Sequence, residues 1–350
     1  MIFHTGSGPR SLCILRLSAI GDICHMLPIV RSLQHAWPET KLSWVIGKLE
    51  HSLVGDIPGI EFIIFDKAKG FSAYQKLYQQ LRGRHFDVLL HMQMSLRASI
   101  ASLLIPAQIK LGFDRKRAHD LQWLFTNKQI PYKQKQHVVD SFFGFIETLG
   151  IHERVMEWDI PIDESTREQV KNLLPETPYI VISPCSSMAY RNWTVEGYAA
   201  VADHIHTEYG KTVVLTGGPS AIEKEYAENI SARCRHQPIN LIGKTSLKEL
   251  LAIIDEAEVV IAPDSGPAHM ATAVNTPVIG LYACTNPDRA RPYLSAELVI
   301  NHYPEAVRDK FSKSVDEVPW GTRVRDPGTM ERIKVEEVIH MLQHFYAQSG

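Results

Sequence analysis

The sequence predicts an α/β protein made of two doubly wound domains that face each other across a cleft. Apolar, strand-like runs alternate with helix-like segments along nearly the whole chain, which is typical of parallel sheets with helical crossovers. The runs lack polar alternation, as expected for parallel strands that are covered on both faces. At 350 residues the chain is also long for a single hydrophobic core. These observations together favour two domains of the same class.

The strand pattern occurs four times in each half of the chain. In the first half it lies at residues 12–17, 42–46, 62–65 and 88–91, and each run is followed by apolar residues at helical spacing. In the second half it lies at residues 179–183, 212–218, 259–263 and 277–282. Ligands of open α/β sheets bind beyond the carboxyl ends of the strands, so we expect functional residues in the loops that follow these runs.

Composition marks the domain boundaries. A polar, proline-punctuated stretch at residues 153–178 is typical of an interdomain connection. Residues 301–330 show no clear periodicity, and we expect a long ordered loop or lid there. The last helical segment could pack back on the N-terminal domain. The predicted parts are an N-terminal domain, a connection, a C-terminal domain and a final helix, at residues 1–155, 156–178, 179–330 and 331–350.

The overall composition is that of an ordinary globular protein, with 45% hydrophobic and 22% charged residues. A formal net charge of -2 argues against a nucleic-acid binder, whose affinity depends on neutralising phosphates. The five cysteines show no CxxC motif, which favours reduced thiols in the core of a cytosolic protein. No segment reaches membrane-spanning length. We therefore expect a cytoplasmic protein, which could still work at a membrane surface.

The loop after the third strand of the second half reads APDSGPAHMATA, residues 262–273. A proline suits the first helical position, and the free backbone N–H groups after Gly266 form a ready phosphate site. Ser265 and His269 can add side-chain donors. The Asp264 carboxylate would repel phosphate but accepts well from sugar hydroxyls. The alternative is that Asp264 or Ser265 only caps the helix.

The loop SPCSSMAYRNW, residues 183–193, follows the first strand of the second half. Its hydroxyls, Ser186 and Ser187, precede a guanidinium at Arg191. This combination suits a diphosphate, because arginine can donate two parallel hydrogen bonds to one phosphate. Taken alone, Arg191 could instead be a surface residue stacked near Trp193.

The first loop of the chain, LRLSAIGDICHMLP, holds one glycine and Asp22. A dinucleotide site would need three glycines here, so a plain dehydrogenase is disfavoured. Pro28 places Asp22 either in a short turn before the helix or in a helix kinked at the proline. Asp22 could be an N-cap residue. His25 is a second candidate base, with packing as its alternative role.

The segments LSAIGDICHMLPIVRSL and APDSGPAHMATAVNTPVIGLYACTNPDRARPY resemble the ADP-heptose:lipopolysaccharide heptosyltransferase family, glycosyltransferase family 9. The resemblance extends over nearly the whole chain, from Ser11 to Tyr346. It implies the GT-B architecture, two Rossmann-like domains around a cleft. It also implies an enzyme that moves a heptose from a nucleotide sugar to the inner core of lipopolysaccharide, with inversion at the anomeric carbon.

The resemblance assigns roles to individual residues. Asp22 matches the family's catalytic aspartate, which implies a general base for the acceptor hydroxyl. Arg191 matches a basic residue, often lysine, that contacts the diphosphate. The other donor-binding matches are a hydroxyl pair, the C-terminal nucleotide-sugar motif, an acidic residue for the adenosine ribose and a residue of the adenine pocket: Ser186, Ser187, Asp264, Ser265, Gly266, His269, Glu223 and Thr245.

No DxD spacing occurs in the chain, so we expect neither a metal-bridged diphosphate nor a cofactor. Arg191 and the helix N-terminus beyond Gly266 are expected to stabilise the leaving ADP instead.

The acceptor side is indicated by charge. Residues 82–136 carry ten Lys or Arg against three acidic residues, in a chain that is nearly neutral. Such a local excess favours an anionic partner. An anionic glycolipid at the inner face of the inner membrane, the inner-core lipopolysaccharide precursor, fits this charge. Arg115, Lys116 and Arg117 are the candidate acceptor-binding residues, and a solvated basic face is the alternative.

Two other functions are compatible with these motifs. A transferase or epimerase that uses a UDP-sugar would share the fold, because a fold does not fix the donor. A non-catalytic protein that binds nucleotide sugars would share the donor motif. Asp22 argues against that second function, because a binding protein needs no base.

Overall fold

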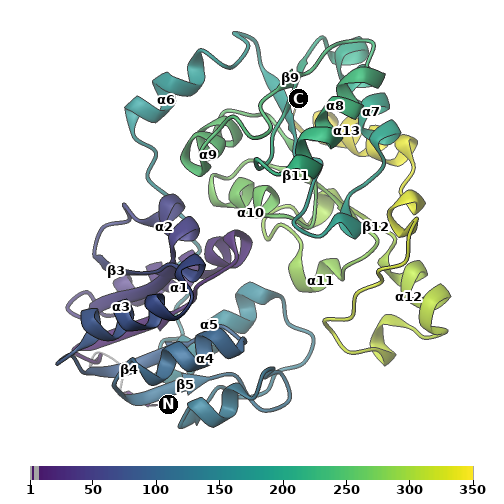
Figure 1. The fold of residues 1–350 in the computed structure, drawn as a ribbon. Helices are drawn as coiled ribbons and strands as arrows, with labels where there is room; N and C mark the ends of the chain where they lie inside the picture. The colour runs from purple at the N-terminus through teal and green to yellow at the C-terminus, as the bar shows by residue number, and fades with distance from the viewer. Residues whose placement is uncertain (1, 4–7, 350) are drawn as a thin grey trace. The chain divides into compact units, whose positions relative to one another are not determined.

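The computed structural model describes residues 2–3 and 8–349, which form two compact units, Met1–Pro161 and Ile162–Gly350 (Figure 1). Each unit contains one six-stranded, all-parallel sheet with helices packed on it. The predicted pair of α/β domains is therefore confirmed. Within the described residues, no helix is both long and apolar enough to cross a membrane.

The first unit has the strand order β3-β2-β1-β4-β5-β6. Its strands are β1 (Ser11–Leu15), β2 (Lys41–Gly47), β3 (Ile60–Phe65), β4 (Phe86–His91), β5 (Ala107–Gly112) and β6 (Lys128–Gln129). Its helices are α1 (Ile20–Ala36), α2 (Lys48–Val54), α3 (Phe71–Leu81), α4 (Leu96–Leu103) and α5 (Val138–Leu149), with 3-10 turns η1 (Lys67–Lys69) and η2 (Gln122–Phe125). Strands β5 and β6 were not predicted, because they lie toward the sheet edge and carry polar residues.

The second unit has the order β12-β11-β10-β7-β8-β9. Its strands are β7 (Tyr179–Ile182), β8 (Thr212–Leu215), β9 (Ile239–Asn240), β10 (Val260–Pro263), β11 (Val278–Tyr282) and β12 (Val299–Asn301). Its helices are α6 (Glu164–Lys171), α7 (Val195–Tyr209), α8 (Ala221–Arg233), α9 (Leu247–Asp255), α10 (Gly266–Ala273), α11 (Pro287–Ala290), α12 (Tyr303–Phe311) and α13 (Val335–Ser349). The 3-10 turns are η3 (Ala189–Arg191), η4 (Ala296–Leu298), η5 (Val315–Glu317) and η6 (Thr329–Arg332).

The two sheets share one topology. When each unit's strands are numbered from its own first strand, both read 3-2-1-4-5-6, the doubly wound Rossmann order. In each sheet the order reverses beside the first strand, between β1 and β4 and between β7 and β10. Such reversal points open a crevice at the carboxyl ends of the strands, where ligands of this fold class bind.

Short-range sequence signals begin and end the helices. The Thr194 hydroxyl accepts a hydrogen bond from Gly197 N–H at the start of α7, and Gly210 adopts the left-handed conformation after its end. At the start of α9, Ser246 and Glu249 form a reciprocal capping box. These helices bury one face against the sheets, so the parallel strands are covered as predicted.

The predicted connection between the domains is corrected at its second half. Helix α6 lies inside the stretch 156–178, yet it packs on α9, and Arg167 forms an ion pair with Asp255 at 2.7 Å. The second unit therefore begins at Ile162 and not at residue 179. The polar composition that suggested a connection reflects the solvent face of a packed helix.

Two expectations about the end of the chain also change. The buried side chains of α13, Val338 and Leu342, join the core of the second unit, so this helix belongs to that unit and is not a separate final part of the chain. Residues 301–330 are not a plain loop. They contain α12 and η5, which enclose a small apolar cluster of their own around Tyr303 and Val324.

The cysteines behave as small core residues, as predicted. All five are free and buried. Burial raises the pKa of the Cys13 and Cys24 thiols to about 12, so neither is a reactive thiolate at neutral pH.

Candidate active site

Asp22 lies in the first turn of α1, just beyond the carboxyl end of β1. The helix continues from Ile20 through Pro28 to Ala36, so Asp22 belongs to the long helix and not to a separate turn before it. The N-cap position is Ala19, whose N–H donates to Asp22 Oδ2 at 3.5 Å. The N-cap alternative for Asp22 is therefore wrong.

The Asp22 carboxylate is paired with Arg16, a residue that the sequence analysis did not single out. Arg16 is 8% exposed, and its Nη1 donates to the Met92 carbonyl at 2.5 Å. Its guanidinium also lies over the Phe142 ring, 5.3 Å from the centroid. Both contacts of Asp22 use Oδ2, which leaves Oδ1 on a side chain that is 35% exposed. The available signal was an arginine inside the apolar run LCILRL.

A partly buried polar network fixes the loop between β1 and α1, directly before Asp22. Leu17 N–H donates to Gln93 Oε1 at 2.6 Å, and Gln93 Nε2 donates to the Ser18 hydroxyl at 3.1 Å. Beneath them Gln122 Nε2 lies 3.1 Å from His91 Nδ1. Burial lowers the pKa of His91 to about 3, so this histidine is neutral and accepts at Nδ1. The loop after β4 thus holds the loop after β1.

The structure supports a packing role for His25. It is 3% exposed and meets His137 edge-on, with 5.4 Å between the ring centroids. Asp22, at a partly exposed helix start, is the better placed base of the two.

In the second unit, Asp264 follows β10 and contacts Arg191 from the loop after β7. Arg191 Nη1 lies 3.0 Å from Asp264 Oδ2 and donates to the Asp264 carbonyl at 3.0 Å, and His269 Nε2 is 3.7 Å from Oδ1. Burial alone would raise the pKa of Asp264, but the hydrogen bond from His269 and the charge of Arg191 outweigh it and lower that pKa. Asp264 is therefore an ionised group that orients two donors.

The start of α10 has an open N-terminus. Ser265 is the N-cap residue, yet its hydroxyl makes no capping hydrogen bond. Ser265 Oγ is buried and has no hydrogen-bond partner within the described residues. The capping alternative is therefore not supported for Ser265. Because Pro267 has no N–H, the free backbone donors at this helix start are those of Gly266 and Ala268, and a buried hydroxyl donor beside them fits an anionic ligand.

The loop after β7 brings Arg191 to this helix start. Asn192 Oδ1 accepts from Ser186 N–H at 2.8 Å and so folds the loop back on itself. The Ser186 side chain is half-buried and that of Ser187 is exposed. The Arg191 side chain is only 14% exposed, so the surface-stacking alternative is wrong. Its Nη1 is used on Asp264, and Nη2 is left for a ligand.

Glu223 lies in the first turn of α8, the helix that follows β8, and Thr245 lies in the loop between β9 and α9. Glu223 accepts from Gly218 N–H and, at 3.0 Å, from the Ser220 hydroxyl, so its carboxylate shapes the turn after β8. The Gly243 N–H donates to Gly217 O at 3.0 Å and joins the two loops. Thr245 Oγ1 is buried without a hydrogen-bond partner in the described chain. Both residues thus belong to the same strand-end edge as Asp264.

Thr285 is a further site residue that the sequence analysis missed. It lies in the loop after β11, three residues beyond the end of that strand, and its hydroxyl hydrogen-bonds the Asp264 carboxyl. The neighbouring Cys284 thiol donates to the Tyr190 carbonyl at 2.9 Å, which ties this loop to the one that holds Arg191. Its position three residues beyond the end of a buried strand was the signal available in the sequence.

The three candidate acceptor residues differ in their surroundings. Arg115 and Lys116 are exposed and lie over the Trp123 and Tyr132 rings, at 4.4 and 4.7 Å from the centroids. These two remain available to an anionic partner.

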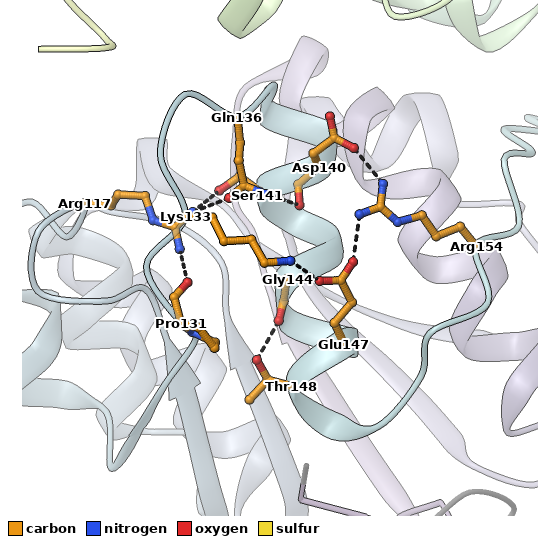
Figure 2. A network of polar contacts seen from close by, with 10 residues as sticks. All are labelled: Arg117, Pro131, Lys133, Gln136, Asp140, Ser141, Gly144, Glu147, Thr148 and Arg154. Atoms are coloured by element: carbon orange, nitrogen blue, oxygen red, sulfur yellow. Dashed lines mark hydrogen bonds and ion pairs between the residues drawn. The ribbon is translucent and has the colours of Figure 1, made fainter.

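The Arg117 side chain forms hydrogen bonds within the first unit. Figure 2 shows its guanidinium reaching Pro131 O at 2.8 Å, Gln136 Oε1 at 2.9 Å and the Ser141 hydroxyl at 3.0 Å. A further contact pairs its Nε with Asp114. Because the Arg117 donors bind the loop to α5, its expected role in acceptor binding finds no support in this geometry.

Among residues 2–3 and 8–349, no cluster of three or more His, Cys, Asp or Glu side chains is arranged to hold a metal ion.

Comparison with known proteins decides the family. The model of glycosyltransferase family 9 (heptosyltransferase) matches residues 74–318. The lipopolysaccharide core heptosyltransferase OpsX of Haemophilus influenzae is 41% identical over 336 residues, which cover 96% of each chain. The chain belongs to glycosyltransferase family 9. It is therefore a glycosyltransferase of the heptosyltransferase family, as the sequence resemblance implied.

Solved structures of family 9 share the fold. A family 9 glycosyltransferase from Veillonella parvula superposes with a TM-score of 0.79 at 22% identity and covers 97% of both chains. The ADP-heptose lipopolysaccharide heptosyltransferase II of E. coli gives a TM-score of 0.74 at 18% identity and covers 97% of this chain and 99% of its own. The two Rossmann-like units are thus those of the GT-B architecture.

Proposed function

We propose that this family 9 enzyme transfers a heptose from ADP-heptose to the inner core of lipopolysaccharide, with inversion at the anomeric carbon. The similar Haemophilus protein is a lipopolysaccharide core heptosyltransferase, and the similar E. coli structure is an ADP-heptose enzyme. The observation that carries the proposal is the set of groups around Asp264: an oriented guanidinium, a buried free hydroxyl and an open helix N-terminus.

The second unit would hold the donor. Arg191, aligned by Asp264, offers Nη2 to the diphosphate, and Ser265 Oγ and the N–H groups of Gly266 and Ala268 offer further donors. Negative charge gathers on ADP as it leaves, and fixed donors in this position stabilise that charge without reorganising. Glu223 is assigned to the adenosine ribose and Thr245 to the adenine pocket.

The first unit would activate the acceptor. The Asp22 carboxylate takes the proton from the acceptor hydroxyl while that oxygen attacks the anomeric carbon. The bond between the anomeric carbon and the diphosphate oxygen breaks, and its electron pair leaves with ADP. Because Arg16 holds Oδ2, the free Oδ1 receives the proton in a fixed orientation. A single displacement of this kind inverts the anomeric configuration.

The proposed acceptor is an anionic glycolipid, and the enzyme would work in the cytoplasm at the inner face of the inner membrane. The exposed cations Arg115 and Lys116 support an anionic acceptor.

A donor panel tests the function. The purified chain is incubated with deacylated lipopolysaccharide core and with ADP-heptose, another ADP-sugar or UDP-sugars, and the products are identified by mass. We expect the mass of one added heptose with ADP-heptose and no addition with UDP-sugars. Transfer from a UDP-sugar, or binding of ADP-heptose without any turnover, would contradict the proposal.

A further inference from the structure

One surface of the first unit carries large apolar side chains in solvent. They lie on the outer side of α4 and on the adjoining turn η2, and each is between 41% and 61% exposed: Leu96, Ile100, Leu103, Leu121 and Leu124. We call these five residues the α4–η2 face. A surface helix normally turns polar residues to water, so an apolar outer stripe indicates a surface with a partner.

Helical geometry explains why this stripe is continuous. Leu96, Ile100 and Leu103 are spaced by four and three residues and therefore share one side of α4. The residues of the opposite side are buried: Ala98, Ser99, Ala101 and Ser102. Leu121 is the N-cap residue of η2, and the Leu124 N–H donates to its carbonyl at 2.9 Å, which holds the two residues in one turn.

Helix α4 and η2 are fixed to each other, so their apolar side chains form a prepared surface. Leu96 N–H donates to Asp120 Oδ2 at 3.2 Å across the two segments. Gln122 is fully buried between them and reaches His91, which in turn contacts the Ser99 hydroxyl at 3.3 Å. The leucines therefore need no rearrangement to meet a partner.

Unpaired cations belong to the same segments. Arg97 lies on α4 itself, and Arg115 lies over Trp123 of η2. Neither forms an ion pair with an acidic side chain in the described residues. The nearby acids are already used, because Asp114 pairs with Arg117 and Asp120 accepts from the start of α4. The partner of this face must therefore offer apolar and anionic groups together.

We propose that the α4–η2 face docks the protein on a membrane surface that carries anionic lipid headgroups. The five apolar side chains enter the boundary between headgroups and acyl chains, and Arg97 and Arg115 meet the headgroup phosphates. Trp123, stacked with Arg115, suits the same interfacial depth. The inference rests on the proposed function, because the proposed acceptor is a glycolipid anchored in a membrane.

A second copy of the chain is the alternative partner of the α4–η2 face. In a symmetric dimer the same patch meets itself, so Arg97 and Arg115 would face the Arg97 and Arg115 of the second copy. That arrangement desolvates like charges without acids to pair them. An anionic bilayer satisfies the cations and the leucines at once.

Vesicle flotation of the full chain tests the docking. We use vesicles of phosphatidylcholine alone and of equal parts phosphatidylcholine and phosphatidylglycerol. Binding is expected only to the anionic vesicles and should weaken as salt rises. The double variant Ile100→Ser/Leu124→Ser should bind at least about tenfold less, given the free energy of burying two such side chains. Leu294→Ser, which removes a leucine that is 51% exposed in the second unit, should bind like the wild type.

Transfer to a soluble, deacylated acceptor separates the two proposals. The Ile100→Ser/Leu124→Ser variant should keep wild-type transfer to that acceptor, since neither residue is among those to which the proposed reaction assigns a role. Absent vesicle binding with intact transfer overturns the docking and leaves the function. Vesicle binding without transfer from ADP-heptose overturns the function and leaves the docking. A dimer in solution that the double variant converts to a monomer, with no vesicle binding, also overturns the docking.

Discussion

Helices α4 and α10 occupy the same place in their two sheets, but the backbone N–H groups at their N-terminal ends are capped differently. Each follows the fourth strand of its unit's 3-2-1-4-5-6 order, spans eight residues and has serine at its N-cap. In α4 the Ser95 hydroxyl accepts from Ala98 N–H at 3.3 Å, and Asp120 accepts from Leu96 N–H. In α10 the equivalent hydroxyl, Ser265, is buried and makes no hydrogen bond in the described residues. One helix start is closed and the other is open.

The loops after the first strands differ in a complementary way. After β1, the first turn of α1 carries a carboxylate, Asp22, that is held by Arg16. After β7, the following loop carries a cation, Arg191, that is held by Asp264. The same fold thus presents a carboxylate in one unit and cationic donors with a free helix start in the other. The comparison assigns the two halves of the reaction by charge, since an anionic diphosphate suits only the second unit.

The largest effect should come from the carboxylate of the first unit. Asp22→Asn keeps the size of the side chain but removes the base, so we expect transfer to fall about a hundredfold or more. ADP affinity, which belongs to the other unit, should stay near the wild-type value in calorimetry. His25→Gln serves as the control for the neighbouring candidate base. Normal turnover of a folded Asp22→Asn protein would move the base to another residue.

The guanidinium of the second unit should come next. Arg191→Ala removes charged hydrogen bonds to the diphosphate and should weaken ADP binding by about 1.5–3 kcal/mol. Arg191→Lys should restore much of that affinity, because the charge returns without the two-pronged geometry. Calorimetric titration with ADP measures both. ADP affinity that neither change alters would break the assignment of the diphosphate to this loop.

The two serines provide a matched pair with a smaller expected effect. Ser265→Ala should weaken ADP binding by about 0.5–1.5 kcal/mol, the contribution of one hydrogen bond, and leave stability nearly unchanged. Ser95→Ala should show the opposite behaviour, because it removes a helix cap worth about 1 kcal/mol of folding free energy and touches no ligand. Denaturant unfolding and ADP titration of both variants are compared. Equal effects on ADP affinity would remove the distinction between the closed and the open helix start.

The smallest effect concerns the basic stretch. Arg115→Ala/Lys116→Ala should raise the KM for the glycolipid acceptor modestly at low salt and match the wild type at high salt, since exposed charges are screened over roughly 8 Å at physiological ionic strength. Arg117→Ala should instead lower the melting temperature, because its guanidinium holds the 114–136 loop on α5. Acceptor KM values that are insensitive to salt in the double variant would return Arg115 and Lys116 to a solvated face.

Much of this architecture could be predicted from the sequence, because the buried parallel strands are continuous apolar runs that few other segments of the chain resemble. The missed strands are β5, β6, β9 and β12. They lie at a sheet edge or next to one, where strands are short or carry polar side chains that break the apolar run. Helix α6 was placed in a connection, because its exposed face outweighs its two buried residues, Thr166 and Val170.

The location of the site could be predicted from the sequence, but the contacts between its side chains could not. Strand ends and a helix start at Gly266 indicated the donor loops, since those features are local in the chain. The pairing of Arg16 with Asp22, and the long-range bonds of Arg191 and Thr285 to Asp264, depend on which loops the sheet brings together. Arg117 was expected to bind the acceptor but forms internal hydrogen bonds. A run of basic residues in the sequence does not show which of them make contacts within the fold.

Backbone amide exchange with and without ADP tests the central distinction between the two units. The start of α10 is open, so ADP should slow exchange at the amides of Gly266 and Ala268. The start of α4 is already capped by Ser95 and Asp120, so exchange at Leu96 and Ala98 should not change. Protection at α4, or no protection at α10 under saturating ADP, would contradict the assignment of the donor to the second unit.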